Sequence, residues 1–287
     1  MDRVLVTGAN GQLGSELKEL LGDAKEHFFT DGDTLDITDL FALKRFVKEN
    51  DIDVILNCAA YTAVDKAEEE AELATLINRD GAKNLAEICV SEGVKLVHIS
   101  TDYVFDGKNY KPYNEEDNPN PTGVYGRSKL EAEEEILRVS PKNSVIIRTS
   151  WVYSSYGNNF VKTMLKLGKT KDEIGVVYDQ VGTPTYAKDL ASAILKIHPI
   201  LKNEKPQIYH YSNEGVLSWY DFAKEIMKMA KLDCKVNPLK TSQYPTPAKR
   251  PHFSLLDKSK IKTDFGLEIA YWKDSLSECL ERLGERR

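Results

Sequence analysis

The stretch VLVTGANGQLGSEL, residues 4–17, decides the fold of this chain of 287 residues. It begins as an apolar, β-branched strand and then places Gly8, Gly11 and Gly14 in a G-x-x-G-x-x-G pattern. Glycine permits a tight turn and a close approach of the backbone to a pyrophosphate, and the start of a following helix offers unpaired N–H groups. The stretch therefore indicates a dinucleotide-binding strand–turn–helix unit, although a lone glycine-rich turn also suits an ordinary strand–helix connection.

The surroundings of this turn favour the dinucleotide interpretation. From Arg3 to about Ser150, short β-branched runs alternate with segments of helical period, such as a helix predicted over residues 38–50 with Thr38 as its N-cap. This alternation is typical of an α/β fold, here a Rossmann-type doubly wound parallel sheet with helices on both faces.

The regular alternation ends near Trp151, and the later chain contains a proline-rich loop, YPTPAKRPHFS. We therefore predict an NAD(P)-binding Rossmann domain over residues 1–150 and a smaller, mainly substrate-binding C-terminal lobe over residues 151–287. Some later segments, for example residues 188–197, are expected to return to the first domain.

An acidic residue, Asp31, follows the second predicted strand, 17 residues after Gly14. This is near the spacing at which an acidic side chain accepts hydrogen bonds from the ribose of a dinucleotide. A carboxylate there repels a 2′-phosphate and favours NAD over NADP, whereas a nearby basic residue would compensate. Asp31 also suits a simple loop cap. Asp36 and Ile37 then lie where an adenine would rest.

Composition and charge exclude several other functions. The net charge is −6 and the charges are scattered, which argues against nucleic acid as a partner. The apolar runs are shorter than the roughly 18 residues of a membrane span, and no secretory signal is visible, so a cytoplasmic location is expected. The four cysteines and five histidines show no metal-ligand spacing, and no histidine is assigned to catalysis.

A second motif, VYGRSKLEAEEEI at residues 124–136, carries Tyr125 and Lys129. Residues four apart share one face of a helix, so the ammonium of Lys129 can lower the pKa of the phenol and let it shuttle a proton. Taken alone, the pair suits an exposed surface better than a catalytic site. Thr101 and Asp102, however, end the fourth predicted strand in HISTDYVFDG, at the sheet edge where ligands bind.

The glycine pattern, the strand-end threonine and Y-x-x-x-K together resemble the extended short-chain dehydrogenases/reductases. The segments NCAAYTAVDKAE, STDYVFDG, VYGRSKLEAE, RTSWVYSSYGNNFVKTML, DQVGTPT and YPTPAKRP are similar to those of the dTDP-4-dehydrorhamnose reductase family, and they span most of the chain. The resemblance implies reduction of the 4-keto group of dTDP-4-dehydro-L-rhamnose to dTDP-L-rhamnose, with hydride from NAD(P)H.

The same resemblance assigns the site residues. Tyr125 would donate the proton, Lys129 would tune the phenol and hold the nicotinamide ribose, and Thr101 would hydrogen-bond the carbonyl. The residues expected to bind the cofactor, NAD(H) or alternatively NADP(H), are Gly8, Gly11, Gln12, Leu13, Gly14, Asp31, Asp36, Ile37, Ala60, Tyr61, Thr62, Tyr125 and Lys129. The residues expected to bind the nucleotide-sugar are Thr101, Asp102, Trp151 and Arg250. Arg250 would bind the pyrophosphate of the nucleotide-sugar.

Other functions remain open at this level. A nucleotide-sugar dehydratase needs Asp-Glu after the strand-end threonine, whereas Tyr103 follows Asp102 here, which weakens dehydration. An epimerase is not excluded, and the regulatory subunit of methionine adenosyltransferase has closely similar segments while serving as a binding partner. A homodimer is possible. A divalent ion accompanies dimers of some family members, and the sequence leaves metal dependence undetermined.

Overall fold

A parallel sheet forms the centre of the molecule. The computed structural model describes residues 2–285, and in this range six strands lie in the order β10-β5-β4-β3-β1-β2. The strands are β1 (Val4–Thr7), β2 (His27–Thr30), β3 (Val54–Asn57), β4 (Lys95–Thr101), β5 (Ser144–Thr149) and β10 (Gln207–Tyr211). Every pairing within this sheet is parallel, which confirms the predicted Rossmann-type doubly wound fold.

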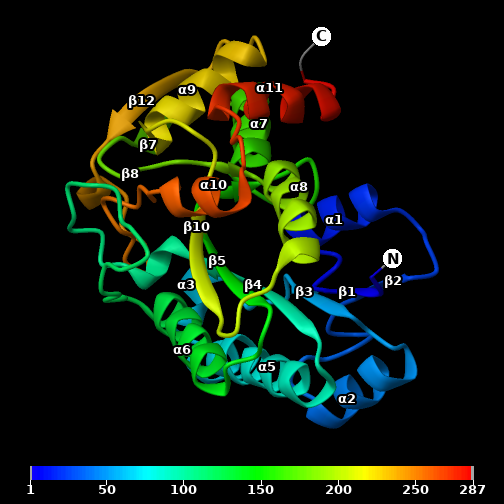
Figure 1. Cartoon of the computed structure of the whole chain (residues 1–287). Helices are drawn as coiled ribbons and strands as arrows, with labels where there is room; N and C mark the ends of the chain where they lie inside the picture. The colour runs from blue at the N-terminus through cyan, green and yellow to red at the C-terminus, as the bar shows by residue number, and fades with distance from the viewer. Residues whose placement is uncertain (1, 286–287) are drawn as a thin grey trace.

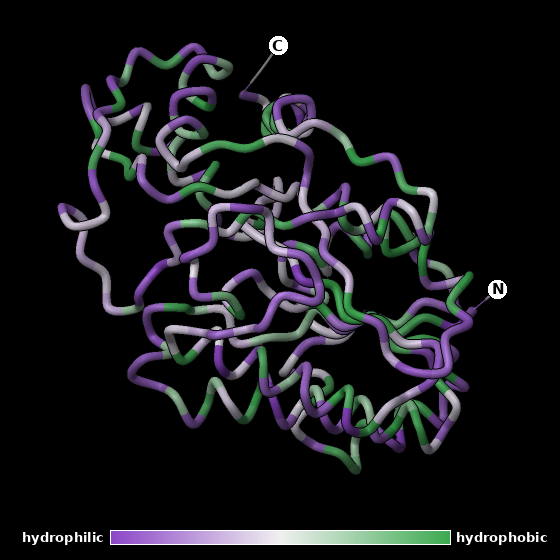
Figure 2. The backbone as a smooth tube through the Cα atoms, turned by 60° about the vertical axis from the view of Figure 1, so that its left-hand side comes forward, coloured by the Kyte–Doolittle hydropathy of each residue, from purple (hydrophilic) through white to green (hydrophobic). Residues whose placement is uncertain are grey.

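Helices cover both faces of the sheet (Figure 1). One face carries α2 (Leu40–Glu49), α5 (Gly81–Glu92) and α6 (Val124–Val139); the other carries α1 (Gln12–Leu21), α8 (Ala187–Ile197) and α10 (Ser259–Phe265). Alternation along β1 explains the two layers, because Val4 and Val6 pack under α1 and α8 while Leu5 packs under α2 and α5. The hydropathy colouring of Figure 2 accordingly shows the central strands largely in green.

The helix predicted over residues 38–50 forms as α2, but its predicted cap is wrong. Asp39 is the N-cap, and its carboxylate accepts a hydrogen bond from the backbone N–H of Ala42 at 3.0 Å. The hydroxyl of Thr38 instead donates to Asp36 at 2.8 Å. A carboxylate accepts more strongly than a hydroxyl, so the aspartate takes the capping position.

The order of the strands reverses beside β1. Its neighbours are β2 on one side and β3 on the other, so the connections leave in opposite directions and open a crevice at the carboxyl ends of the strands. The chain after β3 forms α3 (Val64–Ala67), α4 (Ala71–Thr75) and a π-helical turn (Leu76–Asp80) that runs directly into α5. After β4 comes a short 3₁₀ helix (Asp102–Val104).

The C-terminal part builds a smaller lobe with its own core, at the top of Figure 1. It contains α7 (Phe160–Thr170), α9 (Trp219–Met229), α11 (Trp272–Arg282) and the parallel pair β7 (Glu173–Val177) and β12 (Lys235–Leu239). Two further two-stranded pairs are β6 (Val152–Tyr153) with β9 (Thr185–Tyr186), and β8 (Val181–Gly182) with β11 (Leu217–Ser218). Short 3₁₀ helices lie at His198–Ile200 and Thr241–Gln243.

The chain crosses between the two parts more than once. After residue 150 it returns to the first core through α8, β10 and α10, whose apolar side chains join the cluster under β1. The division of the chain at residue 150 stays a prediction, and Met1, Arg286 and Arg287 of the predicted domains lie outside the described residues. No helix within residues 2–285 is long and apolar enough to cross a membrane.

Candidate active site

A cavity of about 860 Å³ lies at the carboxyl ends of the strands, where the C-terminal lobe faces the sheet. It brings together most of the residues predicted for cofactor and substrate. Those that line it are Gly8, Gly11, Gln12, Leu13, Gly14, Asp31, Asp36, Ile37, Ala60, Thr62, Thr101, Asp102, Tyr125, Lys129 and Trp151. Two predicted residues, Tyr61 and Arg250, are not part of the lining.

The glycine-rich turn has the geometry that a dinucleotide requires. Gly8 adopts a φ of 65°, and a Cβ there would lie 2.6 Å from the backbone nitrogen of Ala59. A Cβ at Gly14 would lie 2.3 Å from the carbonyl oxygen of Gly8, so the start of α1 packs directly against the turn. Helix α1 begins after Gly11 with no side-chain cap, which leaves its first N–H groups for an anion. The turn therefore fits the pyrophosphate of a dinucleotide.

Asp31 both lines the cavity and caps its own loop. Its carboxylate accepts hydrogen bonds from the side-chain amide of Asn10 and from the backbone N–H of Asp33, the latter at 3.1 Å. Asp36 is held in a similar way by the backbone N–H of Thr38 at 2.8 Å. The loop after β2 thus presents two carboxylates at the edge of the cavity.

Tyr61 does not line the cavity, and its phenol donates a hydrogen bond to Glu70. Its backbone is fixed by buried Asn78 in the π-helical turn: the Tyr61 N–H donates to Asn78 Oδ1 at 2.8 Å. The amide of Asn78 also donates to the hydroxyl of Ser128 at 2.9 Å. Asn78 therefore fastens the segment after β3 to α6, one turn from Tyr125, which is a structural role.

Tyr125 occupies the second position of α6. The first N–H of that helix, on Val124, donates to the carboxylate of Glu68 at 2.9 Å. Burial raises the pKa of Tyr125 to about 12; the hydroxyl of Thr101 lowers it and the nearby Asp102 raises it. The sequence predicted that Lys129 would lower the pKa of Tyr125. This prediction is wrong, because desolvation of the buried phenol raises the pKa. The phenol is consequently protonated at neutral pH.

Lys129 is almost completely buried, with 2% of its surface exposed. Its Nζ donates to the carbonyl oxygen of Ile99 at 2.7 Å and lies 3.2 Å from Nε2 of His98. Burial lowers the pKa of Lys129 to about 8, although Glu133 and Cys58 act in the opposite direction. Sequence reasoning assigned no role to His98.

Thr101 and Asp102 lie side by side at the end of β4. The hydroxyl of Thr101 donates to Asp102 Oδ1 at 3.1 Å and accepts the N–H of Tyr103 at 3.2 Å. Within the described residues, Asp102 Oδ2 is buried without a hydrogen-bond partner. Burial raises the pKa of Asp102 to about 7, and the hydroxyls of Ser254 and Thr101 lower it. An unpartnered carboxyl oxygen beside the cavity is a candidate ligand for a sugar hydroxyl.

Trp151 meets a partner that the sequence did not reveal. Its ring stacks on that of Trp219 from α9, with centroids 3.7 Å apart and planes 13° apart, and both line the cavity. Trp151 also adopts a φ of 50°, which is uncommon for a bulky residue and often marks a functional position. The sequence around Trp219 does not reveal this contact, because nothing local shows which side chain faces a distant cavity.

Arg250 is bound by an acidic side chain. Its guanidinium forms a bidentate ion pair with Asp65 of α3, and the loop is tied further by the N–H of Ala248, which donates to Asp65 at 3.1 Å. The pair holds the proline-rich loop against the segment after β3. Arg250 does not line the cavity, and its guanidinium is already paired with Asp65. Its predicted role in binding a phosphate stays a prediction.

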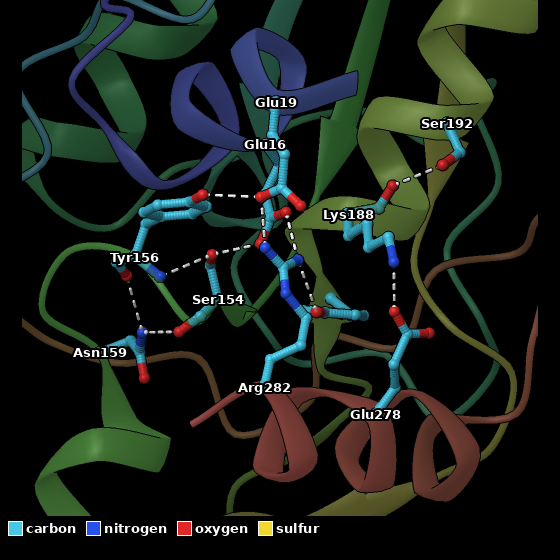
Figure 3. A network of polar contacts seen from close by, with 10 residues as sticks. Glu16, Glu19, Ser154, Tyr156, Asn159, Lys188, Ser192, Glu278 and Arg282 are labelled. Atoms are coloured by element: carbon cyan, nitrogen blue, oxygen red, sulfur yellow. Dashed lines mark hydrogen bonds and ion pairs between the residues drawn. The ribbon is translucent and has the colours of Figure 1, made fainter. Parts of the chain in front are cut away.

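The loop of residues 154–159 lies over the start of α1 and supplies Gly157 and Asn158 to the lining. Figure 3 shows the network that anchors it: Arg282 of α11 reaches Glu16 and Glu19 of α1, and Ser154 and Tyr156 approach the same carboxylates. Glu16 is completely buried, with Ser154 Oγ at 2.6 Å and an Arg282 nitrogen at 2.8 Å. Neither Glu16 nor Arg282 was predicted to serve the site.

Among residues 2–285, no group of three or more histidine, cysteine, aspartate or glutamate side chains is arranged to hold a metal ion. The side chains that line the cavity beside the glycine-rich turn include a phenol, an amine and hydroxyls.

A parallel sheet with this first turn, and a tyrosine and lysine that face the same cavity from one helix, define a short-chain dehydrogenase/reductase of the extended type. The sequence matches the family described as RmlD substrate binding domain over residues 1–285. The chain belongs to this family, that of the dTDP-4-dehydrorhamnose reductases.

Two curated relatives are similar in sequence to nearly the whole of this chain. The dTDP-4-dehydrorhamnose reductase of Aggregatibacter actinomycetemcomitans is 45% identical, covering 96% of this chain and 97% of that protein. The spore coat polysaccharide biosynthesis protein SpsK of Bacillus subtilis is 43% identical, covering 98% of each.

Two crystal structures of dTDP-4-dehydrorhamnose reductases are similarly close. That of Clostridium acetobutylicum has 46% identity and a TM-score of 0.93, covering 98% of this chain and 99% of that one. That of Bacillus anthracis, solved in complex with NADP, has 41% identity and a TM-score of 0.92, covering 98% and 100%.

Proposed function

We propose that this chain reduces the 4-keto group of dTDP-4-dehydro-L-rhamnose to give dTDP-L-rhamnose, using a reduced nicotinamide dinucleotide. The observation that carries the proposal is the shared cavity in which Tyr125, Lys129 and Thr101 line the wall together with the glycine-rich turn. Bound at that turn, the reduced cofactor would supply a hydride to C4 of the sugar. The family membership and the names of the relatives support the choice of substrate.

Tyr125 supplies the proton in this proposal. As the hydride adds to C4, the carbonyl electrons move to the oxygen, which takes the phenolic proton and leaves a phenolate. The raised pKa of Tyr125 keeps that proton in place until negative charge develops on the sugar oxygen. The hydroxyl of Thr101 hydrogen-bonds the same oxygen and stabilises its charge. Lys129 holds the nicotinamide ribose beside them.

The sugar is held by Asp102 and by the stacked rings of Trp151 and Trp219. The free Oδ2 of Asp102 binds a sugar hydroxyl, and the aromatic faces pack against the deoxysugar. We keep Arg250 as a ligand for the substrate pyrophosphate, with the requirement that it shares or exchanges its ion pair with Asp65.

The choice between NADH and NADPH has two opposing arguments. The Asp31 carboxylate at the cavity edge favours NADH because it repels a 2′-phosphate. The Bacillus anthracis relative, however, binds NADP. We propose NADH as the preferred cofactor with NADPH as an alternative, and a comparison of the two dissociation constants decides between them.

The test is a direct assay of the purified protein with dTDP-4-dehydro-L-rhamnose and either NADH or NADPH. We expect loss of the reduced-nicotinamide absorbance and stoichiometric formation of dTDP-L-rhamnose. No consumption with either cofactor would reject the reductase function and favour a purely binding role. Products without net consumption would instead indicate epimerisation.

Three further parts of the proposal concern setting rather than chemistry. The name of the Bacillus subtilis relative places it in spore coat polysaccharide biosynthesis, and we propose a polysaccharide precursor as the product here. A cytoplasmic location and a homodimer stay predictions from sequence; size-exclusion chromatography with light scattering measures the latter.

A further inference from the structure

Three buried polar side chains form a line that leads to the amine of Lys129. Asn57 at the end of β3, His98 on β4 and Lys129 on α6 are 1%, 1% and 2% exposed. The side-chain amide nitrogen of Asn57 lies 2.8 Å from His98 Nδ1, and His98 Nε2 lies 3.2 Å from Lys129 Nζ. None of these contacts is needed to close the sheet, because His98 and Asn57 already pair through their strands.

A backbone N–H and a side-chain hydroxyl fix the direction of the hydrogen bond between Asn57 and His98. The N–H of Ala59 donates to Oδ1 of Asn57 at 3.1 Å, and the hydroxyl of Thr7 donates to the same oxygen at 2.7 Å. The atom of Asn57 that faces His98 is therefore its NH₂ group, which only donates. His98 Nδ1 must accept, so a neutral imidazole carries its single proton on Nε2. That N–H points at Lys129.

A protonated Lys129 does not suit this position. An ammonium group has only donors, and at 3.2 Å it would oppose the Nε2–H of His98. Its remaining partner would be the carbonyl of Ile99 at 2.7 Å. A neutral amine satisfies both contacts, since it donates to Ile99 and accepts from His98 with its lone pair.

We propose that His98, held in one tautomer by Asn57, is a positioning residue that docks Lys129 as the free amine and releases it toward the cofactor ribose as the ammonium ion. The proposal rests on the proposed function in one respect, the role of Lys129 as a ribose ligand. Protonation of Lys129 and its engagement with the cofactor are then one coupled step.

Three other ionisable groups around Lys129, namely His98, Cys58 and Tyr125, have pKa values well away from that of Lys129. From β4, His98 stays neutral because burial lowers its pKa well below the usual value. From the segment after β3, burial raises the pKa of Cys58 to about 12. On α6, Tyr125 has a pKa of about 12, and Glu133 is held by Arg148 of β5 with a 2.6 Å ion pair. Lys129 itself has a pKa of about 8, so amine and ammonium interchange near neutral pH.

One group in the cavity titrates close by and must be separated from Lys129. Asp102 has a pKa of about 7, raised by burial. We expect its effect on cofactor binding to occur at lower pH than that of Lys129 and to be the same in all variants at position 98.

The test measures binding of NADH alone by quenching of the fluorescence of Trp151 and Trp219, which line the cavity, from pH 6.5 to 9.5. In the wild type we expect affinity to fall with a midpoint near pH 8 and to be about tenfold weaker at pH 9 than on the plateau. A Lys129→Met variant identifies the group, because its affinity should be weak and should lose this alkaline fall.

Two matched variants separate positioning from simple filling of the core. His98→Gln keeps a donor near the place of Nε2, and His98→Asn keeps an acceptor near the place of Nδ1 but leaves nothing facing Lys129. We expect His98→Gln to follow the wild type. We expect the midpoint of His98→Asn to rise by at least about one pH unit toward the ordinary lysine pKa of about 10.4, so that affinity at pH 9 falls by no more than about twofold.

The proposal would be overturned if NADH affinity fell with the same pH midpoint in the wild type and in both folded variants. It would also be overturned if the midpoint moved in His98→Gln alone. Should either variant fail to fold, Asn57→Asp gives a second route. A carboxylate would accept a hydrogen bond from a proton-bearing Nδ1 and leave Nε2 bare, which also predicts a higher midpoint. Because no sugar is present, failure of turnover with this binding pattern intact would reject the proposed reaction and leave the role of His98 standing.

Discussion

Arg250 and Asp65 form a bidentate ion pair, with both nitrogen–oxygen distances at 2.7 Å. The hydrogen bond from Arg250 lowers the pKa of the Asp65 carboxyl and keeps it ionised. The loop that follows β12 is thereby joined to the segment that follows β3. A pyrophosphate that approaches this loop competes with Asp65 for the same two N–H groups.

The first prediction concerns this competition. Arg250→Lys removes the bidentate geometry, and we expect the KM for the nucleotide-sugar to rise by about tenfold or more, as for the loss of one charge-assisted hydrogen bond, with the dissociation constant for NADH unchanged. Asp65→Asn is the matched control, since it frees the guanidinium and should leave KM equal or lower. An unchanged KM in Arg250→Lys with a lower Tm would assign the pair a structural role only.

The second prediction tests the proton donor. Tyr125→Phe removes the hydroxyl but keeps the ring that packs edge-on against Tyr103, with centroids 5.6 Å apart. We expect kcat to fall by about 10²–10⁴, the usual contribution of general acid catalysis, while NADH binds within about twofold of the wild type. Single-turnover kinetics measures the chemical step, and an undiminished rate would remove Tyr125 from this role.

The third prediction follows from the raised pKa of Asp102, about 7 in the folded protein against about 3.9 in the unfolded chain. Between these pH values the folded state keeps a proton on Asp102 that the unfolded state has lost. The contribution of Asp102 to the free energy of unfolding therefore falls as the pH rises from about 4 to 7, and it stays constant above pH 7. An asparagine side chain does not titrate and has no such dependence. In thermal unfolding, Asp102→Asn should gain Tm over the wild type as pH rises from 5 to 8; a constant difference would contradict the assignment.

The fourth prediction concerns the anchor shown in Figure 3. Arg282→Met leaves the buried carboxylate of Glu16 without its cation, which we expect to cost about 2–4 kcal/mol and to lower Tm by roughly 4–8 °C. The control is Arg138→Met, which breaks an exposed pair with Glu135 and should have little effect. NADH affinity should fall only in Arg282→Met; an equal Tm for both variants would show that the anchor adds nothing.

The parts of the molecule that the sequence predicts well are those determined locally. The strands, the helices between them and the turn at Gly8 and Gly14 follow from apolar periodicity and from backbone geometry that only glycine permits. Tyr125 and Lys129 both line the cavity, as predicted, because residues four apart share one face of a helix. The contacts of Lys129 with Ile99 and His98 were not predicted. Their chemical roles stay predictions.

The parts that were not predicted depend on pairings between distant residues. Glu16 has the sequence context of an exposed helical glutamate, and only Arg282 and Ser154 make its burial favourable. His98 stands within an apolar strand, and the requirement that a buried polar group has partners was the one available signal. Trp219 could not be placed against Trp151 because their stacking depends on how the lobe sits on the sheet. The sign of the pKa shift of Tyr125 was missed for a similar reason, since burial is a property of the fold.

The ion pair between Glu16 and Arg282 also orders events during synthesis of the chain. Arg282 follows Glu16 by 266 residues, so a ribosome makes the glycine-rich turn and its helix on the order of tens of seconds before their counter-ion exists. Strand β10 and helix α8, which complete the sheet and its cover, are made late as well. A nascent or truncated chain therefore holds the whole nucleotide-binding motif without a finished binding site. The contact that anchors the start of α1 can therefore form only after residue 282 has been made.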